Sequence, residues 1–152
     1  MRRGARGWPL LEMALLVVVG AVVMWAISSR LERMAIETER MAMEMTVTNL
    51  RTGLRWREVN RQLSGQRYDV FLTNPVELIE SAPPNYSGMV AGADIAAVAP
   101  GNWYFDRGIR QLCYRPRAIA QVEMKGQAIC FALRRVAEGD VVLVTTTPYR
   151  WK

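Results

Sequence analysis

An apolar run near the N-terminus constrains this chain more than any other feature. Residues 8–27 are all apolar, glycine or proline, with the exception of one carboxylate, Glu12. As a helix this run would extend about 30 Å at about 1.5 Å per residue, which is the thickness of the hydrocarbon core of a bilayer. An ionised side chain in hydrocarbon costs about 2.5–3.5 kcal/mol on insertion scales, so it is seldom kept without a partner. The run predicts a membrane-spanning helix, with Glu12 either paired or held at the headgroup level of a plain anchor.

The remaining chain is long enough for one small domain. Of the 152 residues, about twenty belong to the membrane run and cannot contribute to a water-soluble core. The net charge is +6, and half of it comes from three arginines in front of the run (Arg2, Arg3, Arg6). Five further arginines, at positions 51, 55, 57, 61 and 67, are spread along one predicted helix and beyond it. A solvated helix surface explains this spread better than a nucleic-acid-binding face, so we expect no nucleic-acid partner.

The residue types that usually carry catalysis are scarce. The chain has no histidine, which removes the commonest general base and the commonest metal ligand. No nucleophile–base pair, phosphate loop or metal-binding spacing is recognisable, so we expect a structural protein, not an enzyme, without metal or cofactor. The two cysteines, Cys113 and Cys130, form no CxxC or zinc pattern. In an oxidising compartment they could form one disulfide, whereas in the cytosol they would be two buried thiols.

The helical pattern continues well beyond the apolar run. No proline occurs between Pro9 and Pro75, and apolar or small residues recur at three- and four-residue steps as far as Leu63. We therefore predict one helix from about residue 9 to about residue 63, whose second half is amphipathic and packs its stripe on a globular partner. Within that stripe, Met34, Met41 and Met45 are expected to pack in the core and not to bind a ligand. The predicted stripe consists of Leu31, Met34, Ala35, Thr38, Met41, Ala42, Met45, Thr48, Thr52, Trp56, Val59 and Leu63.

The second half of the chain predicts one short helix and then strands. Asn74 suits the N-cap of the segment "NPVELIES", with Pro75 in its first turn and Glu77 three residues after the cap. The strand candidates "NWYF" and "IRQLCYR" flank the turn "DRG", and "IAQVEM" and "QAICFALRRV" flank "KG". A final strand is expected in "DVVLVTTTPY". The predicted fold class is α+β: a long N-terminal helix, its first half transmembrane, packed on an antiparallel β-meander of four to five strands.

The start of the chain resembles a known processing signal. The stretch "RGWPLLE", with Gly7 ending a basic leader and Glu12 five residues after it, is similar to the class III signal of type IV pilins and type II secretion pseudopilins. The resemblance implies cleavage between Gly7 and Trp8 by a prepilin peptidase, with methylation of the new N-terminus on Trp8. It also implies that Glu12 neutralises an N-terminal amine during filament assembly. Trp8 replaces the usual phenylalanine, and Pro9 replaces the usual threonine.

The resemblance also implies an organisation and a location. Residues 1–7 would be the leader peptide, residues 8–28 the transmembrane and assembly helix, and residues 29–152 a pilin-like globular domain in the periplasm. The partners would be the prepilin peptidase, other pilin or pseudopilin subunits, the assembly platform and the bacterial inner membrane. The expected function is a minor pilin or pseudopilin of a type IV pilus or of a type II secretion pseudopilus. The alternative is a single-span inner-membrane protein that never polymerises and whose periplasmic domain binds an envelope partner.

An aromatic hairpin adds a more specific resemblance. Trp103, Phe105 and Asp106, followed by Leu112 and Tyr114, are similar to a hairpin of minor pilins from mannose-sensitive-haemagglutinin-type pilus systems. Aromatic hairpins are common, however, and Trp103, Tyr104, Phe105 and Tyr114 are expected to pack on a sheet face in preference to an adhesive role.

Overall fold

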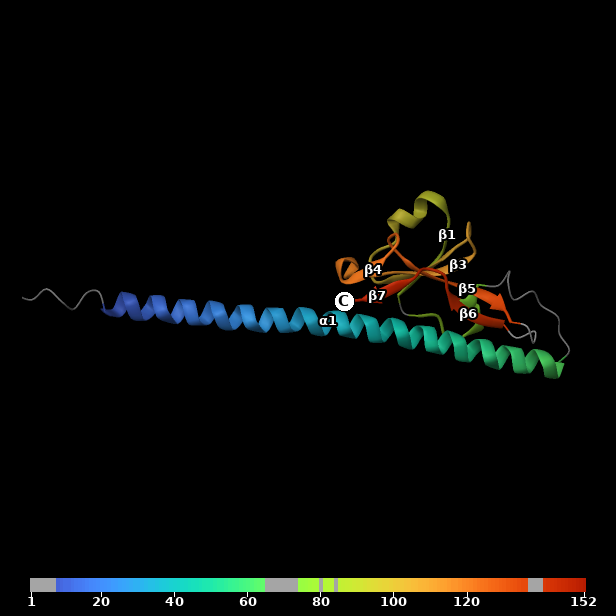
Figure 1. The fold of residues 1–152 in the computed structure, drawn as a ribbon, viewed down its shortest axis with the longest axis horizontal. Helices are drawn as coiled ribbons and strands as arrows, with labels where there is room; N and C mark the ends of the chain where they lie inside the picture. The colour runs from blue at the N-terminus through green and yellow to red at the C-terminus, as the bar shows by residue number, and fades with distance from the viewer. Residues whose placement is uncertain (1–7, 65–73, 80, 84, 137–140) are drawn as a thin grey trace, which may run out of the picture. The chain divides into compact units, whose positions relative to one another are not determined.

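The computed structural model describes residues 8–64, 74–79, 81–83, 85–136 and 141–152 (Figure 1). The chain divides into two compact units, Met1–Thr38 and Glu39–Lys152. The helix α1 (Trp8–Ser64) contributes residues to both units. Its bounds confirm the long helix predicted between about residues 9 and 63. Pro9 lies in its first turn, where a proline is sterically acceptable.

A mixed sheet of five strands forms most of the second unit. The strands are β1 (Tyr86–Val90), β2 (Asn102–Asp106), β3 (Gln111–Arg115), β5 (Ile129–Arg135) and β6 (Val141–Thr145), in the order β1-β2-β3-β5-β6. The pairs β2–β3, β3–β5 and β5–β6 are antiparallel, but β1 pairs with β2 in parallel. The α+β class is therefore confirmed, whereas the prediction of a wholly antiparallel meander is wrong at β1.

Two short strands outside the main sheet form a second sheet. These strands, β4 (Val122–Met124) and β7 (Tyr149–Trp151), pair with each other in antiparallel fashion, with Met124 opposite Tyr149. The hairpin expected around the turn "KG" is not formed, because β5 pairs with β3 and β6 instead. The expected final strand is two strands, β6 and β7. Pro148 lies between them, and proline cannot donate a ladder hydrogen bond.

The described connections contain three 3₁₀ helices: η1 (Pro75–Leu78), η2 (Gly92–Ala97) and η3 (Ile119–Gln121). The first of them confirms the predicted short helix, as a 3₁₀ turn. The side chain of Asn74 accepts a hydrogen bond from the Val76 amide at 3.1 Å, as expected of an N-cap. The Asn74 amide group also donates to the Tyr86 hydroxyl, which ties η1 to β1.

The core of the second unit lies between one face of the main sheet and α1. From α1 it receives Met43, Val47, Leu50 and Leu54, at steps of four, three and four residues. Facing them are Trp103, Phe105, Leu112, Tyr114, Ile129, Phe131 and Leu143, all buried. Burial of such side chains, at about 1.5–3 kcal/mol each, is the main force that holds this segment of α1 on the sheet.

The stripe that was expected to be buried is instead exposed. Met34, Met41 and Met45 are 65%, 56% and 69% exposed, so the prediction that they pack in the core is wrong. The physical reason is that the second half of α1 is apolar on two opposite faces, and both faces have the same three- and four-residue spacing. The sheet covers the face of Met43 and Leu50, and periodicity alone cannot tell the two faces apart.

Candidate functional site

The apolar run forms the first half of α1 and is fully exposed. The described residues contain one helix that is long and apolar enough to cross a membrane, and it lies near the N-terminus. Leu11 is 74% exposed and Ile27 is 49% exposed, so this segment is uncovered as far as the described residues show. The extent of the run supports a single-pass membrane protein. A surface of this kind is stable when lipid or another apolar helix surrounds it.

Glu12 is the fifth residue of α1 and lies within this exposed segment. It makes no ion pair with another described residue. Trp8 is the first residue of α1, and Gly7, the other residue of the expected cleavage site, lies outside the described residues.

The second half of α1 carries an exposed apolar stripe. Its residues, called here the outer stripe, are Met41, Met45, Thr48, Thr52, Trp56, Val59 and Leu63. At 3.6 residues per turn they lie on the face of α1 opposite to the buried residues. The exposed fractions reach 65% at Trp56 and 81% at Leu63. Large apolar side chains exposed along one helix face are typical of an interaction site.

A carboxylate that the sequence analysis did not single out anchors α1 to the sheet. Glu39 accepts a hydrogen bond from the Tyr114 hydroxyl at 2.8 Å, and others from the amides of Arg117 at 2.6 Å and Ala118 at 3.3 Å. These contacts connect α1 to the end of β3 and to the loop that follows it. Once the buried face of α1 is known, the four-residue step from Glu39 to Met43 indicates that Glu39 faces inward.

This contact changes the ionisation of Tyr114. Burial raises the pKa of the Tyr114 hydroxyl well above its usual value, and the hydrogen bond to Glu39 and the charge of that carboxylate raise the pKa further. Tyr114 is only 4% exposed and its hydroxyl is the donor, so the neutral form of the side chain is the form that holds α1 in place.

The aromatic hairpin lies in the core. Trp103, Tyr104, Phe105 and Tyr114 are all buried, with exposed fractions of 1–7%. The ring centroids of Trp103 and Tyr114 are 4.9 Å apart. Asp106 is also buried and accepts hydrogen bonds from the amides of Gly108 and Ile109 in the following turn. The hairpin therefore serves packing, as expected, and presents no aromatic surface to a ligand.

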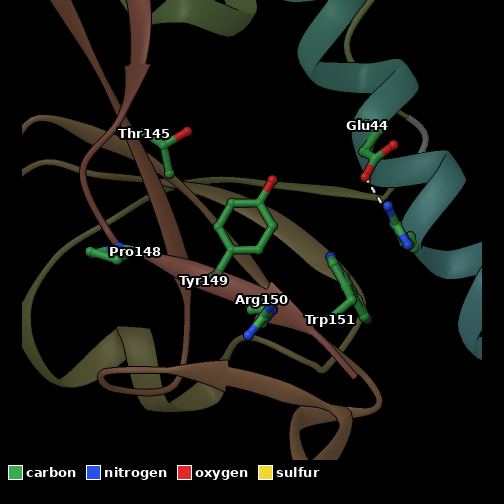
Figure 2. A pocket seen from close by; sticks show the side chains of 7 residues that line it. Glu44, Thr145, Pro148, Tyr149, Arg150 and Trp151 are labelled. Carbon is green, nitrogen blue, oxygen red and sulfur yellow. Dashed lines mark hydrogen bonds and ion pairs between the residues drawn. The ribbon is translucent and has the colours of Figure 1, made fainter.

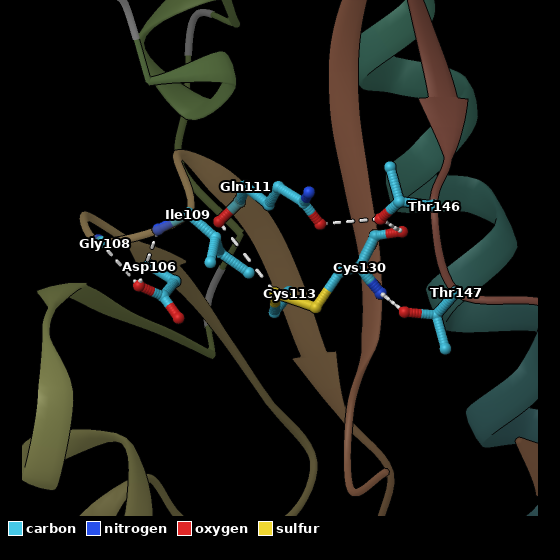
Figure 3. The surroundings of a disulfide bond; sticks show 8 residues. All are labelled: Asp106, Gly108, Ile109, Gln111, Cys113, Cys130, Thr146 and Thr147. Atoms are coloured by element: carbon cyan, nitrogen blue, oxygen red, sulfur yellow. Dashed lines mark hydrogen bonds between the residues drawn. A yellow bond between two sulfur atoms is a disulfide. The ribbon is translucent and has the colours of Figure 1, made fainter. Parts of the chain in front are cut away.

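The two cysteines are joined across neighbouring strands. Cys113 on β3 lies directly opposite Cys130 on β5, and their sulfur atoms are 2.07 Å apart (Figure 3). Hydrogen bonds surround the bridge: the Thr146 hydroxyl donates to the Gln111 side chain at 2.6 Å, and the Cys130 amide donates to the Thr147 hydroxyl at 3.2 Å. A structural disulfide is typical of a domain that folds in an oxidising compartment.

A crevice of about 610 Å³ lies where β7 approaches α1 (Figure 2). Tyr149 and Trp151 line one side, and the ion pair between Arg40 and Glu44, with a distance of 3.0 Å, lies on the other. Burial raises the pKa of Tyr149, and Glu44 contributes to the increase. The Trp151 indole N–H is buried and has no hydrogen-bond partner in the described part of the chain. A water molecule in this polar crevice would satisfy it.

Among the described residues, no group of three His, Cys, Asp or Glu side chains is placed to hold a metal ion. No protein-family model, curated protein or solved structure matches the chain. Two features of α1 are unusual for a self-contained domain: the apolar run with Glu12, and the outer stripe.

Proposed function

We propose that this protein is a minor pilin or pseudopilin, a non-enzymatic structural subunit that is assembled into a filament through its N-terminal helix. Prepilin peptidase would remove residues 1–7 and methylate Trp8. The globular unit would lie in the periplasm, with the apolar run in the inner membrane until the subunit enters a filament.

The observation that carries this proposal is the amount of apolar surface on α1 that the protein itself leaves uncovered. The sheet buries the face of Met43 and Leu50, but the opposite face, with Trp56 and Leu63, is exposed. The apolar run is exposed on all sides. A lipid bilayer can cover the run but not the outer stripe as well, because the stripe belongs to the same unit as the sheet.

Helices of neighbouring subunits would cover both surfaces. The outer stripe extends about 33 Å from Met41 to Leu63, and the apolar run extends about 30 Å, at about 1.5 Å per residue. The run of one subunit is therefore long enough to cover the stripe of another. Such a contact joins two different surfaces, and it leads to an open filament where the rotation from one subunit to the next does not close a ring.

Glu12 would set the register of this packing. Cleavage after Gly7 would create an α-ammonium group on Trp8, of the same or of a neighbouring subunit. A carboxylate and an ammonium group attract each other strongly where the dielectric constant is low, and this attraction offsets much of the cost of burying Glu12. The disulfide between Cys113 and Cys130 supports a periplasmic location for the globular unit.

The substitution Glu12→Ala tests this proposal in cells that have the prepilin peptidase and the filament machinery. We expect the variant to insert into the membrane normally but to be absent from sheared filaments. The matched control is Glu32→Ala, which removes an exposed carboxylate of the same helix beyond the apolar run and should be incorporated normally. Incorporation of Glu12→Ala at the level of the unmodified protein would refute the proposal and favour a single-span protein that does not polymerise.

A further inference from the structure

At the outer edge of the main sheet, backbone N–H and C=O groups have no hydrogen-bond partner among the described residues. Strand β6 is the last strand of the order β1-β2-β3-β5-β6, so only β5 pairs with it. The Thr146 amide donates to the Cys130 carbonyl at 2.8 Å, which fixes the alternation of the ladder. Because alternate residues of an antiparallel strand face the same neighbour, Val142 and Val144 bond to β5. Val141, Leu143 and Thr145 direct their backbone N–H and C=O groups to the open edge.

An apolar groove runs beside this edge. It has a volume of about 740 Å³ and lies between β6 and α1. Two of its apolar residues are well exposed, Val59 at 48% and Val142 at 39%. The strand itself, "VVLVT", contains no charge and no proline. Natural sheets usually protect an exposed edge strand with charged residues or prolines. An edge strand without them is suited to pair with a further strand.

The charged side chains described around the groove are mostly positive. Arg51 and Arg55 of α1 line it, and the exposed Arg134 lies on the neighbouring strand β5. Among the described residues of the lining, the acidic one is Glu58, which is 9% exposed and already has a partner. A second copy of β6 would bring a second set of these arginines to the same edge, so charge disfavours pairing between two copies.

We propose that the groove beside β6 binds an extended segment of another protein, with apolar side chains at alternate positions and carboxylates at its ends. The segment would pair with the backbone of Val141, Leu143 and Thr145, and so become the sixth strand of the sheet. Its apolar side chains would cover Val59 of α1, and its carboxylates would pair with Arg51 and Arg55. This interaction uses neither Glu12 nor the leader, and it shares Val59 with the outer stripe, so it is tested on the protein outside a filament.

The test uses the full chain in detergent micelles and labelled peptides as probes. The first peptide alternates valine and threonine and has glutamates at both ends. A second peptide has lysines at the ends, and a third repeats the first with N-methyl groups on alternate amides. Fluorescence anisotropy gives the affinities. We expect the glutamate peptide to bind. The lysine peptide loses the ion pairs with the arginines, and the N-methylated peptide loses the backbone hydrogen bonds to β6, so each should bind at least about tenfold more weakly.

Two pairs of variants locate the contact on this edge. Val141→Pro removes one outward N–H at the first residue of β6, where a proline is tolerated, while Ile119→Pro places a proline at the first residue of η3, outside the groove. Arg55→Glu reverses a charge in the groove, while Arg107→Glu reverses one in the exposed turn after β2. We expect the first member of each pair to weaken binding about tenfold and the second to leave it unchanged.

Hydrogen exchange gives a second readout. Binding of the glutamate peptide should slow exchange of the Leu143 and Thr145 amides, whereas Val142 and Val144 are already protected by β5. Equal affinity for the glutamate and lysine peptides, no binding of either, or no effect of Val141→Pro would each overturn the proposal. A dimer that Val141→Pro abolishes would also overturn it, in favour of pairing between two copies.

Discussion

The contact between Glu39 and Tyr114 gives the most exacting prediction for the fold, because one carboxylate accepts three hydrogen bonds that connect α1 to the sheet. Replacing it with alanine leaves the buried Tyr114 hydroxyl and the amides of Arg117 and Ala118 without this acceptor. We expect Glu39→Ala to lower the free energy of unfolding substantially, although alanine favours the helix slightly more than glutamate does.

The magnitude follows from the environment of each donor. A hydrogen bond to a charged group contributes about 1.5–3 kcal/mol, and a buried donor without a partner costs about 1–3 kcal/mol. Arg117 is exposed, so water can replace Glu39 at its amide, whereas Tyr114 is 4% exposed and has no such substitute. The expected loss for Glu39→Ala is therefore about 3 kcal/mol. Tyr114→Phe, which keeps the ring packing, should cost about 1–1.5 kcal/mol.

The assay is urea unfolding of the full chain in detergent micelles, followed by near-ultraviolet circular dichroism. The control is Glu37→Ala, an exposed carboxylate on the same helix, which should change the free energy of unfolding by less than about 0.5 kcal/mol. The double variant, Glu39→Ala with Tyr114→Phe, should lose less free energy of unfolding than the two single variants together, by about 1 kcal/mol or more. A loss below about 0.5 kcal/mol for Glu39→Ala, or strict additivity, would show that this contact does not hold α1 on the sheet.

Four further predictions concern the core, the outer stripe, the disulfide and the ionisation of Tyr114. Leu50→Ala should lower the free energy of unfolding by about 2–5 kcal/mol. Trp56→Gln, on the outer stripe, should change it by less than about 0.5 kcal/mol and yet reduce filament incorporation, and urea unfolding and filament shearing measure the two effects. Serine at both Cys113 and Cys130 should cost roughly 3 kcal/mol, because the disulfide closes a loop with a separation of 17 residues; an unchanged unfolding midpoint would contradict this. The pKa of Tyr114 is raised in the native state, so above about pH 10 the unfolded chain loses this proton first and stability falls as pH rises. Tyr114→Phe should make the loss of stability with rising pH less steep. An equally steep loss in this variant would show that Tyr114 is not the group responsible.

The sequence was most informative where local rules decide the structure. The helix was predicted to within a residue or so of its bounds, because no proline interrupts it and its first half is uniformly apolar. The N-cap at Asn74 and the strands around Trp103 and Cys113 were also predicted, since turn residues bound each of them closely.

Long-range contacts decided the rest. Strand β1 was missed because "YSGMV" is short, contains a glycine and pairs in parallel with β2, which leaves no hairpin signal. The pairing of β4 with β7 joins strands that the sequence separates widely. The buried face of α1 was misassigned because Met45 and Val47 belong to two apolar stripes of equal spacing, and only the sheet selects between them. Glu39 was overlooked for the same reason.

The mass of the N-terminal peptide from protein purified out of its membrane tests the filament account most directly. Removal of residues 1–7, with one methyl group added to Trp8, is the result that the account predicts. An N-terminus that still begins with Met1, in cells whose other prepilin-like proteins are trimmed, would contradict it, because Glu12 would then have no neighbouring α-ammonium group to meet.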